Sequence, residues 1–129
     1  MSDFRNTEIL IVDDDDNVRA AVSRTLERAG YIVHQGRNGR EGLELLRTKE
    51  CVLLITDIIM PEMEGIELIG NVRSSHPHLK IVAMSGGGRS RNTDFLKIAK
   101  DMGACDTIYK PVTATQLLEV IERNLPPFG

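Results

Sequence analysis

The sequence lacks tryptophan and contains only two cysteines, Cys51 and Cys105, which belong to no C-x-x-C pair. Isolated cysteines of this kind are typical of reduced thiols in an intracellular protein rather than of a disulfide framework. Aromatic residues of all types make up only 4% of the chain, which argues against a flavin held between aromatic rings. The length of 129 residues is sufficient for a fold that needs neither a disulfide nor a structural metal.

Long hydrophobic runs and blocks of positive charge are absent as well. The longest apolar run, Cys51–Ile55, has five residues, whereas a helix that spans a bilayer needs about 20. The first residues lack the apolar segment of a signal peptide, so we expect a cytoplasmic protein without membrane contact. With a net charge of −3 and no basic cluster, nucleic acid is not an expected partner either.

Five short apolar segments recur along the chain and predict five strands. They are continuous rather than alternating, which is typical of a parallel sheet that is covered on both faces. Segments of helical periodicity separate them, so the order strand–helix repeats and predicts an α/β fold with right-handed crossovers. The expected strands are Ile9–Val12, Tyr31–Val33, Val52–Ile55, Ile81–Met84 and Thr107–Tyr109.

Capping residues mark the ends of the helical segments. Thr113 and Gln116 have the spacing of a capping box, and Asn38 with Glu41 has the same spacing with Asn in the Ser/Thr position. Glycine is favoured where a helix ends in a left-handed backbone conformation. The helices are expected at about residues 16–29, 40–49, 65–75, 95–102 and 114–125, with Asp15 or Asp16 capping the first, and Gly30 and Gly103 ending the first and fourth.

Polar residues follow the predicted strands at their carboxyl ends. Because these ends meet at one edge of a parallel sheet, where ligands bind in open α/β folds, the side chains are expected to converge. The residues are Asp13 and Asp14 after the first strand, Asp57 after the third, Ser85 after the fourth and Lys110 after the fifth.

Three carboxylates at one edge need a cation or a proton between them. Two like charges about 4 Å apart cost about 4 kcal/mol at an effective dielectric constant of 20. Mg²⁺ fits best, because it accepts carboxylate oxygens and keeps several waters. With a hydroxyl from Ser85 and an ammonium from Lys110, the site is complementary to a phosphoryl group, which Asp57 can accept as a nucleophile to form an acyl phosphate.

Four motifs in this chain resemble those of the response regulator receiver domains of two-component signalling. Any one of them is a weak signal, but all four occur in the order and spacing of that family. The resemblance covers about residues 8–125, within a single domain, 1–129, to which no output domain is expected to be attached. The motifs are Ile9–Asp14, Thr56–Pro61 with Gly65, Met84-Ser85-Gly86 and Tyr109-Lys110-Pro111.

The resemblance implies a flavodoxin-like, doubly wound α/β fold. Its five-stranded parallel sheet, (βα)5, has the strand order 2-1-3-4-5, as in the stand-alone receivers of chemotaxis. It also implies a phosphorelay in which the phosphoryl donor is a phosphohistidine on a sensor histidine kinase or a histidine phosphotransfer protein. The downstream protein target is unknown.

The same resemblance implies a role for each site residue. Asp57 is expected to be phosphorylated, next to Mg²⁺ held by Asp13, Asp14, Asp57 itself and the backbone carbonyl of Ile59. The remaining roles implied are a hydrogen bond from Ser85 to the phosphoryl group, an ion pair of that group with Lys110, and a cis Lys110-Pro111 peptide bond.

Two other functions remain open at this point. A phosphatase with an aspartyl nucleophile needs a second acid two residues after the nucleophile, and Ile59 occupies that position. A phosphorylated switch that catalyses only its own phosphorylation and dephosphorylation is therefore favoured over an enzyme. A flavodoxin-like nucleotide or flavin binder is disfavoured by the scarcity of aromatic residues.

The chain departs from the receiver pattern in its last strand. Many receivers have an aromatic residue three positions before the lysine, and here Thr107 occupies that position. Tyr109 shares the face of Thr107, because alternate residues of a strand point to the same side. The mechanism of signalling on that face is therefore expected to differ.

Overall fold

The computed structural model describes residues 7–58, 65–85 and 93–125, with the side chains of residues 93–96 left out. Strands and helices alternate along these residues, as the sequence predicts. The strands are β1 (Glu8–Val12), β2 (Ile32–Gly36), β3 (Cys51–Asp57), β4 (Lys80–Ser85) and β5 (Asp106–Tyr109). The helices are α1 (Asp16–Arg28), α2 (Gly39–Thr48), α3 (Gly65–Ser75), α4 (Thr93–Met102) and α5 (Ala114–Asn124).

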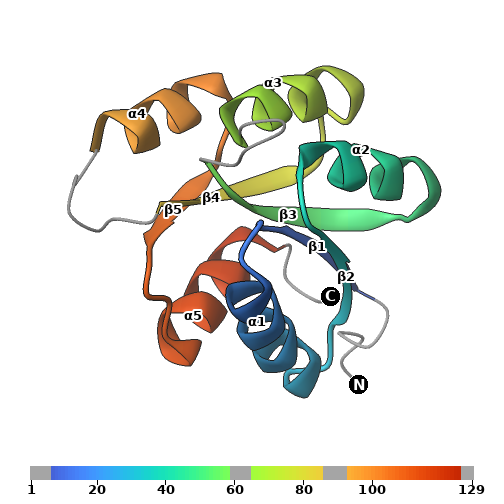
Figure 1. Ribbon diagram of the computed structural model, residues 1–129, viewed down its shortest axis with the longest axis vertical. Helices are drawn as coiled ribbons and strands as arrows, with labels where there is room; N and C mark the ends of the chain where they lie inside the picture. The colour runs from blue at the N-terminus through green and yellow to red at the C-terminus, as the bar shows by residue number, and fades with distance from the viewer. Residues whose placement is uncertain (1–6, 59–64, 86–92, 126–129) are drawn as a thin grey trace.

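The five strands form one parallel sheet in the order β2-β1-β3-β4-β5. Helices α1 and α5 cover one face, and α2, α3 and α4 cover the other (Figure 1). The predicted doubly wound, flavodoxin-like fold and its strand order are therefore confirmed. In this topology the carboxyl ends of β1, β3, β4 and β5 lie side by side along one edge of the sheet.

The central strands send alternate side chains into two separate hydrophobic cores. In β1, Ile9 and Ile11 contribute to the core under α1 and α5, whereas Leu10 and Val12 contribute to the core under α2, α3 and α4. All four side chains are fully buried, and each burial contributes about 1.5–3 kcal/mol. Burial on both faces explains why the strand segments are continuously apolar.

Local signals set most helix ends as predicted. The carboxylate of Asp15 accepts hydrogen bonds from two backbone N–H groups in the first turn of α1. At the start of α5, Thr113 and Gln116 form both hydrogen bonds of the capping box. Gly30 and Gly103 follow α1 and α4 with φ angles of 103° and 128°, which non-glycine residues rarely adopt.

The start of α2 differs from the predicted capping box. Asn38 caps the helix, because its side-chain oxygen accepts a hydrogen bond from the N–H of Glu41 at 2.9 Å. The Glu41 carboxylate turns instead to Arg37, whose backbone N–H and guanidinium both donate to it at 2.8 Å. These hydrogen bonds from Arg37 lower the pKa of Glu41.

The second strand extends further than the sequence predicts. We expected it to end at Val33, but β2 continues through His34, Gln35 and Gly36. β2 lies at the edge of the sheet, where polar side chains can be part of the strand and still reach solvent. Hydrophobic pattern alone is therefore a poor guide to its length.

Candidate functional site

Acidic side chains gather at the carboxyl end of the sheet, as predicted. Asp13 and Asp14 follow β1, and Asp57 is the last residue of β3. Each of the three offers a carboxylate oxygen, and these atoms lie within 4.8 Å of one another. Asp13 is fully buried and Asp57 is 6% exposed, whereas Asp14 faces solvent. Two poorly solvated carboxylates therefore lie beside one that is open to water.

Lys110 brings an ammonium group into this cluster from the end of β5. Its Nζ atom lies 2.7 Å from Oδ2 of Asp13 and 3.4 Å from Oδ2 of Asp57. Burial is the largest single influence on the pKa of Lys110 and lowers it, but the two carboxylates together outweigh burial and raise the pKa above its ordinary value. The ammonium therefore stays charged at neutral pH.

Backbone and side-chain hydrogen bonds fix Asp13 in place. Its N–H donates to the carbonyl of Gly36 at 3.2 Å, and its Oδ1 accepts from the N–H of Asp15 at 2.8 Å. The buried guanidinium of Arg19 donates to the Asp13 carbonyl at 2.7 Å. Sequence reasoning missed Arg19, although its position three residues before Val22 on the buried face of α1 is a usable signal.

Backbone hydrogen bonds hold Ile58, just after β3, and Gly65, the first residue of α3. The N–H of Ile58 donates to the carbonyl of Met84 at 3.1 Å, and the N–H of Gly65 donates to the carbonyl of Ile58 at 3.0 Å. A Cβ atom at position 65 would lie 1.9 Å from the carbonyl oxygen of Asp57, so only glycine fits. Gly65 thus allows the first turn of α3 to approach the backbone of Asp57.

Ser85 and Lys110 follow the geometry expected from their strands. Ser85 ends β4 and is 3% exposed, and its carbonyl accepts a hydrogen bond from the N–H of Lys110 at 2.8 Å. The Lys110-Pro111 peptide bond is cis, as predicted. Ile59, whose carbonyl was expected to be a metal ligand, lies outside the described residues.

In β5 the chain departs from the receiver pattern at Thr107, which shares one face of the strand with Tyr109. Thr107 is partly buried, while Tyr109 is 47% exposed. Tyr109 therefore does not fill an inner pocket in this conformation. The segment Gly86–Arg91, which precedes α4, lies outside the described residues.

The acidic cluster fits a hard divalent cation. Three carboxylates and one ammonium leave a net negative charge at the sheet edge. Oδ2 of Asp13 is buried 2.7 Å from the Lys110 ammonium, and a carboxylate oxygen has a second lone pair with which it can bind a metal. Carboxylate oxygens of this kind are the ligands that Mg²⁺ and Ca²⁺ prefer.

Residues 9–122 match the sequence profile of the response regulator receiver domain. The chain belongs to this family. Receivers of the family act in two-component signalling, and the convergence of three aspartates, a serine and a lysine on one sheet edge agrees with that role. The match spans the sheet, its carboxyl edge and nearly all of α5.

Solved receivers have the same fold. The chemotaxis protein CheY4 of Vibrio cholerae superposes with a TM-score of 0.85 at 30% identity, over 93% of this chain and 99% of that one. The fold of a solved receiver therefore matches nearly the whole of this chain.

Two curated relatives are longer than this chain. The transcriptional regulatory protein SrrA of Staphylococcus aureus is 31% identical over 88% of this chain, which spans 45% of that regulator. The sensor kinase CckA of Brucella abortus is 38% identical over 60% of this chain, which spans 8% of that kinase. The expectation that residues 1–129 form a single domain without an output domain stays a prediction.

In the ranges 7–58, 65–85 and 93–125, no helix combines the length and the apolar composition of a membrane span.

Proposed function

We propose that Asp57 accepts a phosphoryl group from a phosphohistidine, and that the phosphorylated domain changes its affinity for a partner protein. The observation that carries this proposal is the convergence of the Asp13, Asp14 and Asp57 carboxylates with the ammonium of Lys110. Of the three carboxylates, Asp57 is the one at the end of a central strand, between the acidic pair on β1 and Ser85 on β4. A phosphoryl group there has the Ser85 hydroxyl and the Lys110 ammonium as donors, and the carboxylates of Asp13 and Asp14 nearby to hold a cation.

The transfer is a displacement at phosphorus. A carboxylate oxygen of Asp57 forms a bond to phosphorus while the phosphorus–nitrogen bond of the phosphohistidine breaks. The electron pair of that bond returns to the imidazole, and the product at Asp57 is an acyl phosphate. Hydrolysis later transfers the phosphoryl group to water and regenerates the carboxylate, so each cycle consumes one phosphoryl group.

Mg²⁺ is the proposed cofactor, held by Asp13, Asp14, Asp57 and the backbone carbonyl of Ile59. When bound, it offsets the negative charge of the carboxylates and of the incoming phosphoryl oxygens. Lys110 stabilises the phosphoryl group by a charge-assisted hydrogen bond. The hydroxyl of Ser85 donates a further hydrogen bond once the phosphoryl group is present.

The partners are proteins in this proposal. A sensor histidine kinase or a histidine phosphotransfer protein supplies the phosphoryl group, and an unidentified downstream protein reads the phosphorylated state. The protein acts in the cytoplasm, without nucleic acid or membrane as a partner, and as a switch rather than a turnover enzyme. Absence of steady hydrolysis of a phosphomonoester by the purified protein supports the switch over an aspartyl phosphatase.

The proposal is tested by intact-mass measurement after incubation with acetyl phosphate. With Mg²⁺ present, the parent protein and Asp101→Asn, a control at an exposed position on α4, are expected to gain one phosphoryl group. Asp57→Asn is expected to gain none, and chelation of divalent cations is expected to prevent the gain in the parent and in Asp101→Asn. An adduct of equal yield on Asp57→Asn, or one that forms at an unchanged rate without a divalent cation, contradicts the proposal.

A further inference from the structure

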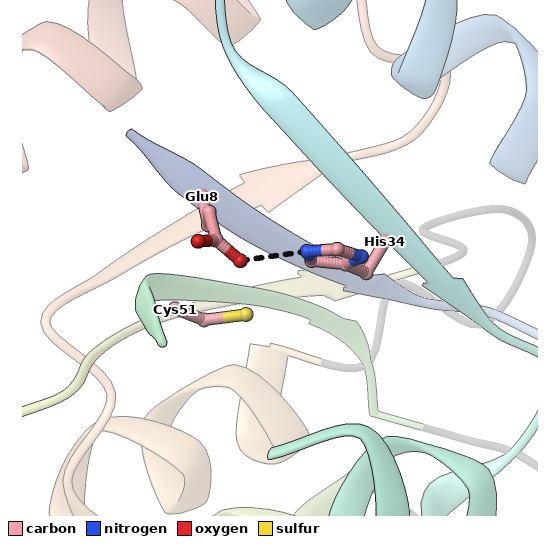
Figure 2. A group of neighbouring side chains, drawn as sticks. All are labelled: Glu8, His34 and Cys51. Carbon is pink, nitrogen blue, oxygen red and sulfur yellow. Dashed lines mark hydrogen bonds and ion pairs between the residues drawn. The ribbon is translucent and has the colours of Figure 1, made fainter. Parts of the chain in front are cut away.

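A second group of metal-binding side chains lies at the opposite end of the sheet. Glu8 and Cys51 are the first residues of β1 and β3, and His34 lies in β2 (Figure 2). Each offers one donor atom, and these three atoms lie within 4.8 Å of one another. Asp13 lies five positions after Glu8, a distance of about 16 Å along an extended strand. The group is thus distinct from the acidic cluster.

An irregularity in strand pairing brings the cysteine into this group. Glu8 pairs with Cys51, but Ile9 pairs with Leu53, so β3 has an extra residue at this point. By simple alternation Cys51 would share the face of Leu53, under α1 and α5. It packs instead against the core under α2, α3 and α4, the face that also holds Leu10. Bulges of this kind often redirect a side chain toward a functional site.

The other two side chains reach the same face through regular pairing. His34 pairs with Leu10, and Glu8 lies two residues before Leu10, so both project to the side under α2 and α3. The Nε2 atom of His34 lies 2.8 Å from Oε1 of Glu8, at hydrogen-bond distance. The histidine and glutamate side chains are 19% and 26% exposed, and Cys51 is half-buried. The three donors are therefore held together but remain accessible to a small ion.

We propose that Glu8, His34 and Cys51 form a binding site for a thiophilic divalent cation such as Zn²⁺. Sulfur, imidazole nitrogen and carboxylate oxygen are the donors that Zn²⁺ takes in proteins, with bond lengths of about 2.0–2.3 Å. Donors of a tetrahedral site are then about 3.4 Å apart, so the Glu8–His34 hydrogen bond opens by about 0.6 Å to admit the ion. In the described part of the chain three donors meet here, which leaves the fourth position to water.

The chemistry of this site separates it from the carboxylate cluster. A thiolate and an imidazole select Zn²⁺, Co²⁺ or a similar borderline ion over Mg²⁺, whereas the all-oxygen cluster at the other edge favours Mg²⁺. Without an ion, burial first and the charge of Glu8 second raise the pKa of the Cys51 thiol to about 11. Binding of the cation replaces the thiol proton, which passes to solvent.

The site would join three adjacent strands at their amino ends. β1 is hydrogen-bonded to both β2 and β3, so an ion shared by Glu8, His34 and Cys51 would link these three strands near their amino ends. The acidic cluster lies at their carboxyl ends. Because the ion would bind the folded chain and not the unfolded one, its binding raises the midpoint of thermal unfolding. The inference is independent of the proposed function, because no residue is common to the two sites.

Cobalt substitution tests the inference directly, because a cobalt–thiolate bond gives a charge-transfer absorption that oxygen ligands do not. Co²⁺ is titrated with excess Mg²⁺ present to occupy the carboxylate cluster. The variants are Cys51→Ser and His34→Gln, whose amide can still donate to Glu8. Cys105→Ser and His78→Gln are the matched controls, since both positions are exposed. Circular dichroism establishes that each variant is folded.

The parent and both controls are expected to bind one Co²⁺ with the charge-transfer band, and Zn²⁺ is expected to displace it and raise the unfolding temperature. Cys51→Ser is expected to lose the band, and His34→Gln to lose at least about tenfold in affinity. If the parent has no band, or if His34→Gln binds as tightly as the parent, the three-strand site does not exist. Loss of the band in Cys105→Ser would also overturn it.

Discussion

The ammonium of Lys110 lies 2.7 Å from the carboxylate of Asp13, although β3 and β4 separate the strands that precede these two residues. The lysine side chain therefore spans the edge of the sheet and contacts Asp13 as well as Asp57. Its charge offsets part of the repulsion among the carboxylates before a cation arrives. Lys110 thus competes with the cation for Asp13 and is available to the phosphoryl group.

Replacing Lys110 by alanine is expected to leave the fold intact and to tighten Mg²⁺ binding. A unit charge about 4 Å away contributes about 1 kcal/mol even in water, which corresponds to roughly fivefold in affinity. Calorimetric titration of Mg²⁺ into Lys110→Ala measures the change, and Lys100→Ala, at an exposed position on α4, is the control. Weaker Mg²⁺ binding by Lys110→Ala than by the control contradicts this role.

The same variant is expected to respond less to phosphorylation. Loss of the charge-assisted hydrogen bond between Lys110 and the phosphoryl group removes about 1.5–3 kcal/mol from the phosphorylated state. NMR spectra with and without beryllofluoride, a phosphoryl mimic, compare Lys110→Ala with the parent. Chemical-shift changes of the same size and extent in both proteins would show that the lysine does not transmit the signal.

Gly65 is expected to be far less tolerant of substitution than Gly70 in the same helix. A methyl group at position 65 would meet the backbone of Asp57 and Ile58 at 1.9–2.4 Å, whereas one at position 70 would meet the terminal methyl of Met102 at 2.9 Å. Gly65→Ala is expected to lower the free energy of unfolding by about 1–3 kcal/mol and to slow phosphorylation. Gly70→Ala is expected to change stability by no more than about 1 kcal/mol.

Urea denaturation followed by circular dichroism measures both glycine variants, and intact mass gives their phosphorylation rates. Equal stability of the two variants would mean that the start of α3 can move away from the backbone of Asp57 without cost.

Asp106 is expected to link stability to acidic pH. Burial is the largest influence on its pKa and raises it, but hydrogen bonds from Asn124, Arg123 and the N–H of Thr107 outweigh burial and lower the pKa below 3.8. The ionised carboxylate therefore stabilises the fold above about pH 4, and this contribution disappears as the pH falls through the lowered pKa.

Asp106→Asn is accordingly expected to cost about 1 kcal/mol at neutral pH, a modest value because Arg123 is largely exposed. The difference from the parent is expected to shrink as the pH falls below the ordinary pKa of an aspartate, and to vanish below the lowered pKa of Asp106, where both side chains are neutral. Urea denaturation at a series of pH values checks this. A difference that persists unchanged in acid would mean that the lost interaction is not that of the charged carboxylate.

The acidic cluster at the carboxyl edge of the sheet could be predicted from the sequence because its residues lie at or just after the ends of buried strands. A continuous apolar run such as Ile9–Val12 identifies a central strand, and parallel topology then brings Asp13 and Asp57 to the same edge. Arg19 was missed, because helical periodicity places it on the buried face of α1 but does not identify the backbone carbonyl of Asp13 as its partner.

The group at the opposite edge could not be predicted for a different reason. Glu8, His34 and Cys51 come from three strands, and their convergence depends on strand register and on the extra residue of β3. Alternation along the sequence assigns Cys51 to the wrong face. The polar residues His34 and Gln35 also hid the true length of β2, because an edge strand can expose them at little cost.

The most direct test of the central claim identifies the carboxylate that carries the phosphoryl group. Protein treated with acetyl phosphate and Mg²⁺ is reduced with borohydride, which converts an aspartyl phosphate to homoserine, and is then analysed by tandem mass spectrometry of its peptides. The account predicts homoserine at position 57 and unmodified aspartate at positions 13 and 14. Homoserine at position 13 or 14, with position 57 unmodified, would contradict it.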